Sequence, residues 1–152
     1  MKIDEITFQH EISTEEYNAL RGSVDFIRIT PKRAACALAN SLYKIVACDG
    51  ETPVGMARVV GDGGYVYFIC DVIVHPHYQS RGLGRKIIEH VLEWLEGQVD
   101  EGETIMVNLM SAMNKEEFYG KLGFHRRPFG NHGSGMSRWI SGSGPRPEVE
   151  PQ

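Results

Sequence analysis

The sequence predicts one mixed α/β domain with an antiparallel first half. Apolar runs of strand length alternate with amphipathic runs of helix length, and residues 48–53, Cys-Asp-Gly-Glu-Thr-Pro, separate two apolar runs as a hairpin turn does. The 152 residues, 41% of them apolar and 24% charged, suit one ordinary globular domain. We expect that domain over residues 1–140. A disordered tail is expected over residues 141–152, which hold three prolines and two glycines.

The first half of the chain predicts two helices and three strands. Ser13 and Glu16 have the spacing of a capping box, which opens a helix reaching about residue 21. Thr30 and Pro31 are a typical cap and first residue for a second helix, through residue 42. The strands are expected at residues 3–8, 43–47 and 54–60.

The second half predicts two further helices and three strands. After a glycine-rich turn at residues 61–64, the apolar residues 65–74 indicate a long strand. A long amphipathic helix follows, with one apolar side formed by Leu83, Ile87, Ile88, Val91, Leu92 and Leu95. Residues 105–109 indicate a strand, Asn114 is expected to cap a short helix that Gly123 ends, and residues 136–140 are a candidate last strand.

The turn between the long strand and the long helix, residues 79–84, has the composition of a phosphate-binding turn. A helix start presents unpaired backbone N–H groups and the positive end of the helix dipole. Gly82 and Gly84 let the backbone approach an anion, since neither carries a Cβ. Arg81, Arg85 and Lys86 add positive charge that a merely structural turn does not need.

Two segments carry a resemblance to a known family. Residues 72–84, Val-Ile-Val-His-Pro-His-Tyr-Gln-Ser-Arg-Gly-Leu-Gly, resemble the acetyl-CoA signature of the GNAT N-acetyltransferases, Q/R-x-x-G-x-G/A after a strand. Residues 118–124, Phe-Tyr-Gly-Lys-Leu-Gly-Phe, resemble that family's second hallmark. The resemblance implies a GNAT fold, in which a central, mostly antiparallel sheet is splayed between its fourth and fifth strands and flanked by helices.

The resemblance also implies how acetyl-CoA is held. The pyrophosphate is expected on the turn and helix start, formed by Gln79, Ser80, Arg81, Gly82, Leu83, Gly84 and Arg85. The pantetheine arm is expected beside the long strand, at Val72, Ile73 and Val74, with a backbone N–H facing the acetyl oxygen. A strand splayed from its neighbour leaves backbone groups unpaired, and an amide-bearing ligand can pair with them.

Two residues are candidates for catalysis. Tyr119 matches the tyrosine of the second hallmark and is the expected general acid, because a phenol is protonated at neutral pH. Asp71, a lone carboxylate in an apolar strand, is the candidate base, with an ion pair to Arg58 as the structural alternative. A histidine or a chain of water molecules is left open as the base instead. The family's usual asparagine, seven residues before the tyrosine, is replaced by Ala112.

Other polar residues receive structural interpretations. His75 and His77 are expected to be exposed loop residues, and no metal site is predicted. Cys36, Cys48 and Cys70 each lie in an apolar stretch and are expected to be buried free thiols in a reducing cytoplasm. A net charge of -4 argues against a nucleic-acid partner, and no apolar run predicts a membrane span or a signal peptide.

The predicted function is direct transfer of an acetyl group from acetyl-CoA to a primary amine of a small molecule or peptide, in a ternary complex. The acceptor site is expected from residues 20–26 and 126–136. The alternative is a non-catalytic acetyl-CoA sensor on the same fold. A P-loop or Rossmann nucleotide site is disfavoured because the lysine–serine/threonine pair and the third spaced glycine are missing. A homodimer is left open.

Overall fold

A five-stranded sheet forms the centre of the molecule in the computed structural model, which describes residues 3–142. Its order is β1-β2-β3-β4-β5, with β1 to β4 antiparallel and β5 parallel to β4. The strands are β1 (Thr7–Gln9), β2 (Tyr43–Asp49), β3 (Thr52–Gly61), β4 (Val66–Val74) and β5 (Met106–Leu109). Pairing between β4 and β5 stops at Ile69 and Leu109, although β4 continues to Val74, so the sheet is splayed there as predicted.

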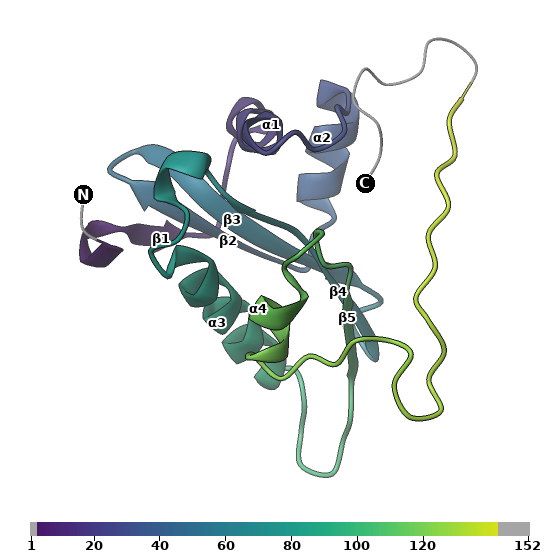
Figure 1. Cartoon of the computed structure of the whole chain (residues 1–152). Coiled ribbons are helices and arrows are strands. Elements are labelled where there is room, and N and C mark those ends of the chain that lie inside the picture. Colours follow the sequence, from purple (N-terminus) through teal and green to yellow (C-terminus); the bar gives the residue numbers. More distant parts are fainter. Residues whose placement is uncertain (1–2, 143–152) are drawn as a thin grey trace.

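Helices cover both faces of this sheet (Figure 1). The helices are α1 (Thr14–Ser23), α2 (Pro31–Ala39), α3 (Leu83–Glu96) and α4 (Glu116–Gly120), with short 3-10 turns η1 (Ile3–Glu5) and η2 (Pro76–Tyr78). Helices α1 and α2 pack on one face, and α3 and α4 on the other. No helix over residues 3–142 is long and apolar enough to cross a membrane.

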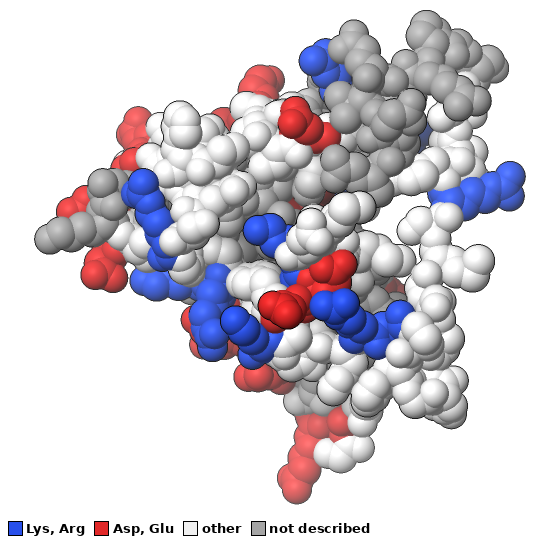
Figure 2. All heavy atoms as spheres, in the orientation of Figure 1, with Lys and Arg blue, Asp and Glu red and all other residues white. Residues whose placement is uncertain are grey.

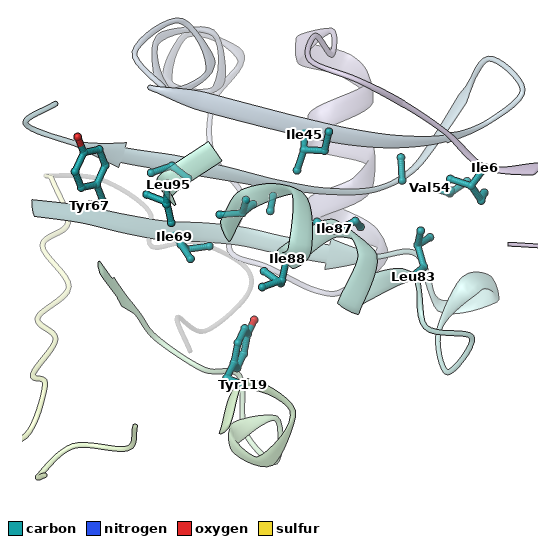
Figure 3. Packing of buried hydrophobic residues seen from close by; sticks show 14 residues of the cluster. Ile6, Ile45, Val54, Tyr67, Ile69, Leu83, Ile87, Ile88, Leu95 and Tyr119 are labelled. Atoms are coloured by element: carbon teal, nitrogen blue, oxygen red, sulfur yellow. The ribbon is translucent and has the colours of Figure 1, made fainter. Parts of the chain in front are cut away.

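Successive side chains of the central strands are buried on opposite faces of the sheet. In β2, Ile45 and Ala47 belong to the larger core under α3, whereas Val46 and Cys48 belong to the smaller core under α1 and α2. Figure 3 shows the larger core, in which the apolar side of α3 meets β2, β3 and β4. The apolar face predicted for α3 is therefore its packing face.

Most predicted elements are present, and several details are corrected. The Ser13–Glu16 capping box forms, and Thr30 caps α2, which ends at Ala39 because Asn40 occupies its C-cap. Residues 136–140 pair with no described strand, so the candidate last strand is not formed in the single chain.

Two local predictions are wrong. Asn114 adopts a positive φ of 68° before α4, and Lys115 is the N-cap. Cys36 is exposed because it lies on the outer side of α2, whereas Cys48 is buried and Cys70 is half-buried. Most of the predicted disordered tail, residues 143–152, lies outside the described residues.

Candidate functional site

The turn before α3 has the backbone geometry that an anion site needs. Ser80 and Gly82 both have left-handed φ, 62° and 83°, and Gly82 is the N-cap of α3. No side chain caps the helix, so its first N–H groups have no side-chain acceptor. Gln79 fixes the start of the turn, because its Nε2 donates to the Val74 carbonyl at 2.8 Å.

Positive charge surrounds this turn. Arg81 lies over the Tyr78 ring, with its guanidinium carbon 6.0 Å from the ring centroid, and the Tyr78 hydroxyl donates to Asp49. Arg85 pairs with Glu89 one helical turn later, and both side chains are more than half exposed. Figure 2 shows lysine and arginine side chains gathered over the part of the surface where α3 lies in Figure 1. A polyanionic ligand would therefore meet both N–H donors and cationic side chains here.

Gly84 is the place where three predicted parts of the site meet. A Cβ built on Gly84 would lie 3.6 Å from Cζ of Phe118 and 3.6 Å from Cγ2 of Val74. The first turn of α3, the end of β4 and the start of α4 are thus in contact. The residue beside Phe118 is Tyr119, so this contact brings the proposed acid to the same side of the sheet as the phosphate turn.

Strand β4 contains a bulge next to its unpaired edge. Met56 pairs with Ile73 and Arg58 pairs with Cys70, so Asp71 and Val72 together lie opposite Ala57. The bulge begins immediately after β4 parts from β5. The following residues, Val72, Ile73 and Val74, therefore present an edge that β5 does not pair with, where the pantetheine arm was expected.

Asp71 holds this bulge through a buried network. Its φ is 50°, and its side chain is only 7% exposed. The Oδ1 atom accepts from Nη1 of Arg21 at 2.5 Å, and Oδ2 accepts from Nε of Arg58 at 2.7 Å and from the Tyr17 hydroxyl. Burial, followed by the Asp71 charge, raises the pKa of Tyr17 to about 12.

The role predicted for Asp71 as general base does not fit this geometry. Two arginines and a phenol already bond the two carboxylate oxygens, and the side chain is buried, so an amine would have to reach an enclosed group that is engaged by other partners. The structural alternative, an ion pair with Arg58, does form, and Arg21 extends it. Tyr17 was missed, and Arg21 was expected only as part of the acceptor segment 20–26, although their spacing of four places them on one face of a helix.

Tyr119, the expected general acid, lies in α4 and belongs to the core on the α3 side of the sheet. It is 8% exposed and packs edge-on against Phe118 and Phe124. Burial raises its pKa to about 12, so the phenol is protonated at neutral pH. Figure 3 shows its hydroxyl pointing from α4 toward the sheet, and no described group forms a hydrogen bond with it.

The histidines follow the end of β4, and His77 is exposed as expected, whereas His75 is half-buried. His75 Nδ1 accepts from the backbone N–H of His77 at 3.2 Å. His75 is therefore the N-cap of the turn η2, and His77 lies within that turn. The two rings pack edge-on against each other, and that of His75 also packs against Tyr78. Within residues 3–142 no group of three potential metal ligands is found.

The α1–α2 connection forms a pocket of about 310 Å³. It is lined by Asn18, Arg21, Gly22, Phe26, Ile27, Arg28 and Ile29. Arg21 links it to the β4 bulge, since Nη1 of this side chain bonds Asp71 and Nη2 bonds the Ile27 carbonyl at 2.7 Å. Residues 126–136, the other segment expected at the acceptor site, are exposed and do not line this pocket.

Comparison with known proteins identifies the family of this chain. Residues 6–124 match the model of the Acetyltransferase (GNAT) family. The N-acetyltransferase ycf52 of Pyropia yezoensis, itself uncharacterized, is 32% identical over 126 residues, covering 80% of this chain and 70% of the relative. The chloroplastic GCN5-related N-acetyltransferase 1 of Arabidopsis thaliana is 30% identical over 124 residues, covering 80% and 61%.

Solved structures agree with this match. A protein of unknown function from meticillin-resistant Staphylococcus aureus, described as a probable acetyltransferase, superposes with a TM-score of 0.80 at 28% identity, covering 89% of this chain and 99% of that one. A GNAT family acetyltransferase from Streptococcus pneumoniae gives a TM-score of 0.71 at 28% identity, covering 90% and 96%. The chain belongs to the GNAT acetyltransferase family.

Proposed function

We propose that this protein transfers the acetyl group of acetyl-CoA to a primary amine of a small molecule or peptide, directly and in a ternary complex. The observation that carries the proposal is the contact of Gly84 with Val74 and Phe118. It joins an uncapped helix start, an unpaired strand edge and a buried protonated tyrosine on one side of the sheet. Each of these three parts meets one requirement of acetyl transfer from a thioester.

The residues present fit acetyl-CoA. Backbone N–H groups of Leu83, Gly84 and Arg85 are not capped by a side chain and would take the pyrophosphate, and Arg81 would add charge. The bulge at Asp71 leaves the backbone of Val72 to Val74 clear of β5, where it would pair with the amides of pantetheine. This part of the proposal rests on the turn's backbone angles and on the open edge of β4.

A backbone N–H of β4, the Tyr119 hydroxyl and water would together carry out the transfer. The amine nitrogen bonds the acetyl carbon as the carbon–sulfur bond breaks, while an N–H on the edge of β4 polarises the carbonyl oxygen. Tyr119 gives its phenolic proton to the leaving sulfur and regains one from water. The amine's proton passes to water, since both oxygens of Asp71 are engaged by Arg21, Arg58 and Tyr17. Asp71 therefore acts as a positioning residue for the bulge.

We assign the amine acceptor to the pocket between α1 and α2. Its apolar lining of Phe26, Ile27 and Ile29 suits the body of an organic amine or a peptide side chain. Arg21 ties the pocket to the bulge that shapes the reacting edge of β4. The predicted cytoplasmic location remains a prediction, and one relative is named as chloroplastic.

Turnover tests the function. Purified protein incubated with acetyl-CoA and a mixed panel of amines should release free CoA thiol, with the acetylated amine identified by mass. Release of the CoA thiol in the absence of an amine would contradict direct transfer to an amine. So would the absence of thiol release with every amine of the panel. The second result would favour the sensor interpretation if acetyl-CoA still binds.

A further inference from the structure

The buried network behind the β4 bulge holds one positive charge more than negative charge. Asp71 is the carboxylate that both Arg21 and Arg58 bond, at 2.5 and 2.7 Å. The third partner, Tyr17, is neutral, since burial raises its pKa to about 12. The two arginine side chains are only 11% and 14% exposed. A charge removed from water in this way is costly unless an opposite charge lies close to it, so the network favours a second anion nearby.

The acidic residues on either side of Arg21 in the chain do not supply this second anion. Glu16 belongs to the capping box at the start of α1, and Asp25 is exposed. Within residues 3–142, neither arginine of the network bonds a carboxylate other than that of Asp71. The Nε atom of Arg21 is also buried and has no hydrogen-bond partner in the same part of the chain. A bound anion would compensate the excess charge.

Arg21 brings this excess charge to the acceptor pocket. The pocket of about 310 Å³ lies at the α1–α2 connection, on the face of the sheet opposite α3 (Figure 1). Its charged lining residues among those described are Arg21 and Arg28, and none of the described lining residues is acidic. A hollow lined by charges of one sign and by apolar walls concentrates ions of the other sign. The pocket is therefore suited to a ligand with a negative charge.

The pocket is held in shape by its own backbone. The N–H of Phe26 donates to the Arg21 carbonyl at 3.0 Å, and Nη2 of Arg21 donates to the Ile27 carbonyl at 2.7 Å. The guanidinium carbon of Arg21 lies 5.5 Å from the centroid of the Phe26 ring, so charge and apolar surface adjoin. The volume is at the lower end of the range for ligand pockets, about 300–1,000 Å³, which suits a small molecule.

We propose that the acceptor is a small amine that also carries an anionic group, a carboxylate or a phosphate, on an apolar body. This inference rests on the proposed function, because it gives the substrate class of the same site. The anion would lie against Arg21 and Arg28, and the apolar body against Phe26. The amine would face the edge of β4, to which Arg21 is tied through Asp71. The nitrogen gains the acetyl group and loses a proton, and the anion is unchanged.

Amines that share a body and differ in the head group test this substrate class. L-Phenylalanine carries a carboxylate, 1-amino-2-phenylethylphosphonate carries a phosphonate in place of a phosphate, and L-phenylalaninamide is neutral at that position. The same three head groups on a leucine body vary the apolar part. The preferred acidic amine should be acetylated with a kcat/KM about tenfold or more above that of the amide, as expected for a hydrogen bond to a charged group. The head group with the larger ratio identifies the anion.

Substitutions of the lining arginines test the cause of the preference. Arg28→Gln should reduce the acid-to-amide ratio about two- to fivefold, the range of an exposed ion pair. Arg21→Gln should abolish the ratio, because Asp71 and Arg58 then balance each other. The matched control is Arg33→Gln, which removes an exposed arginine of α2 outside the pocket lining and should leave the ratio unchanged. If Arg21→Gln does not fold, the comparison of Arg28→Gln with Arg33→Gln decides.

Calorimetric binding of the same amines to the CoA-bound protein separates this inference from the proposed function. If the amide is acetylated as well as the acids, or if Arg28→Gln and Arg33→Gln give equal ratios, the inference is overturned and acetyl transfer stands. Binding that prefers the acidic amines, without turnover of any amine, would support the charge selectivity and contradict acetyl transfer. Neither turnover nor a binding preference would overturn both.

Discussion

Replacing Asp71 by asparagine should destabilise the protein strongly, because the carboxylate neutralises two buried arginines. The side chains of Arg21 and Arg58 are 11% and 14% exposed, and each bonds a different oxygen of Asp71. Asparagine tolerates the left-handed φ of 50° and keeps one acceptor oxygen. The substitution therefore isolates the loss of charge from a change of backbone conformation.

The magnitude follows from the burial of these charges. Removing one partner of a buried ion pair costs about 3–5 kcal/mol, since the remaining charge is left without compensation. In a domain of this size each kcal/mol lowers the melting temperature by about 2–4 °C, so we expect a fall of about 6–20 °C. Urea unfolding at neutral pH, followed by circular dichroism, measures the free energy directly.

Asp25→Asn is the matched control, since Asp25 also has a left-handed φ, 58°, but is exposed. Its unfolding free energy should stay within about 0.5 kcal/mol of the native value. If Asp71→Asn lost less than about 1 kcal/mol while turnover collapsed and recovered at high pH, the reasoning would be refuted. Asp71 would then be the base that the sequence had indicated.

Three further predictions concern the site. Tyr119→Phe should lower kcat by about 10²- to 10⁴-fold with little change in the KM for acetyl-CoA. The control Tyr43→Phe removes the hydroxyl of a tyrosine whose ring stacks on Trp94, and it should leave kcat unchanged. Equal rates for the two variants would make Tyr119 a packing residue. Phe26→Ala should raise the KM for the amine and leave that for acetyl-CoA unchanged; the reverse pattern would remove the pocket from the acceptor site. In the folded state Tyr17 and Tyr119 have pKa values of about 12, above their ordinary 10, so their contribution to stability is complete below pH 10 and is lost as the pH rises toward 12. Urea unfolding across that range should show a smaller decline for Tyr119→Phe, and an unchanged decline would contradict the raised pKa.

Local patterns predicted the parts of the fold that local physics determines. The capping box at Ser13, the proline start of α2 and the apolar side of α3 all depend on residues within one or two turns of each other. The phosphate turn belongs to this group, because Gly82 must adopt a positive φ at a helix start. The splay of β4 from β5 was implied by family resemblance and is seen in their register.

Tertiary contacts explain what the sequence did not predict. The partners of Asp71 come from α1 and β3, 50 and 13 residues away, and only the cross-strand arginine was foreseen. The role of Phe118 depends on α4 packing against the start of α3. Residues 136–140 have strand character, yet a strand needs an edge to pair with, and this segment runs clear of the sheet (Figure 1).

Ligand-dependent stability tests the central claim most directly, that the turn before α3 and the edge of β4 hold acetyl-CoA. At 100 times its dissociation constant, a ligand bound only to the folded state adds about 2.7 kcal/mol. At about 2–4 °C per kcal/mol, the melting temperature should rise by about 5–11 °C, with CoA nearly as effective and ATP or NAD far less so. Gly84→Glu should abolish the shift, because its longer side chain would extend past Val74 and Phe118 and bring a negative charge to the first turn of α3. Gly84→Ala should keep it, since its Cβ would be in ordinary contact with Phe118 and Val74 at 3.6 Å. Equal shifts with ATP, or an undiminished shift for Gly84→Glu, would contradict the account.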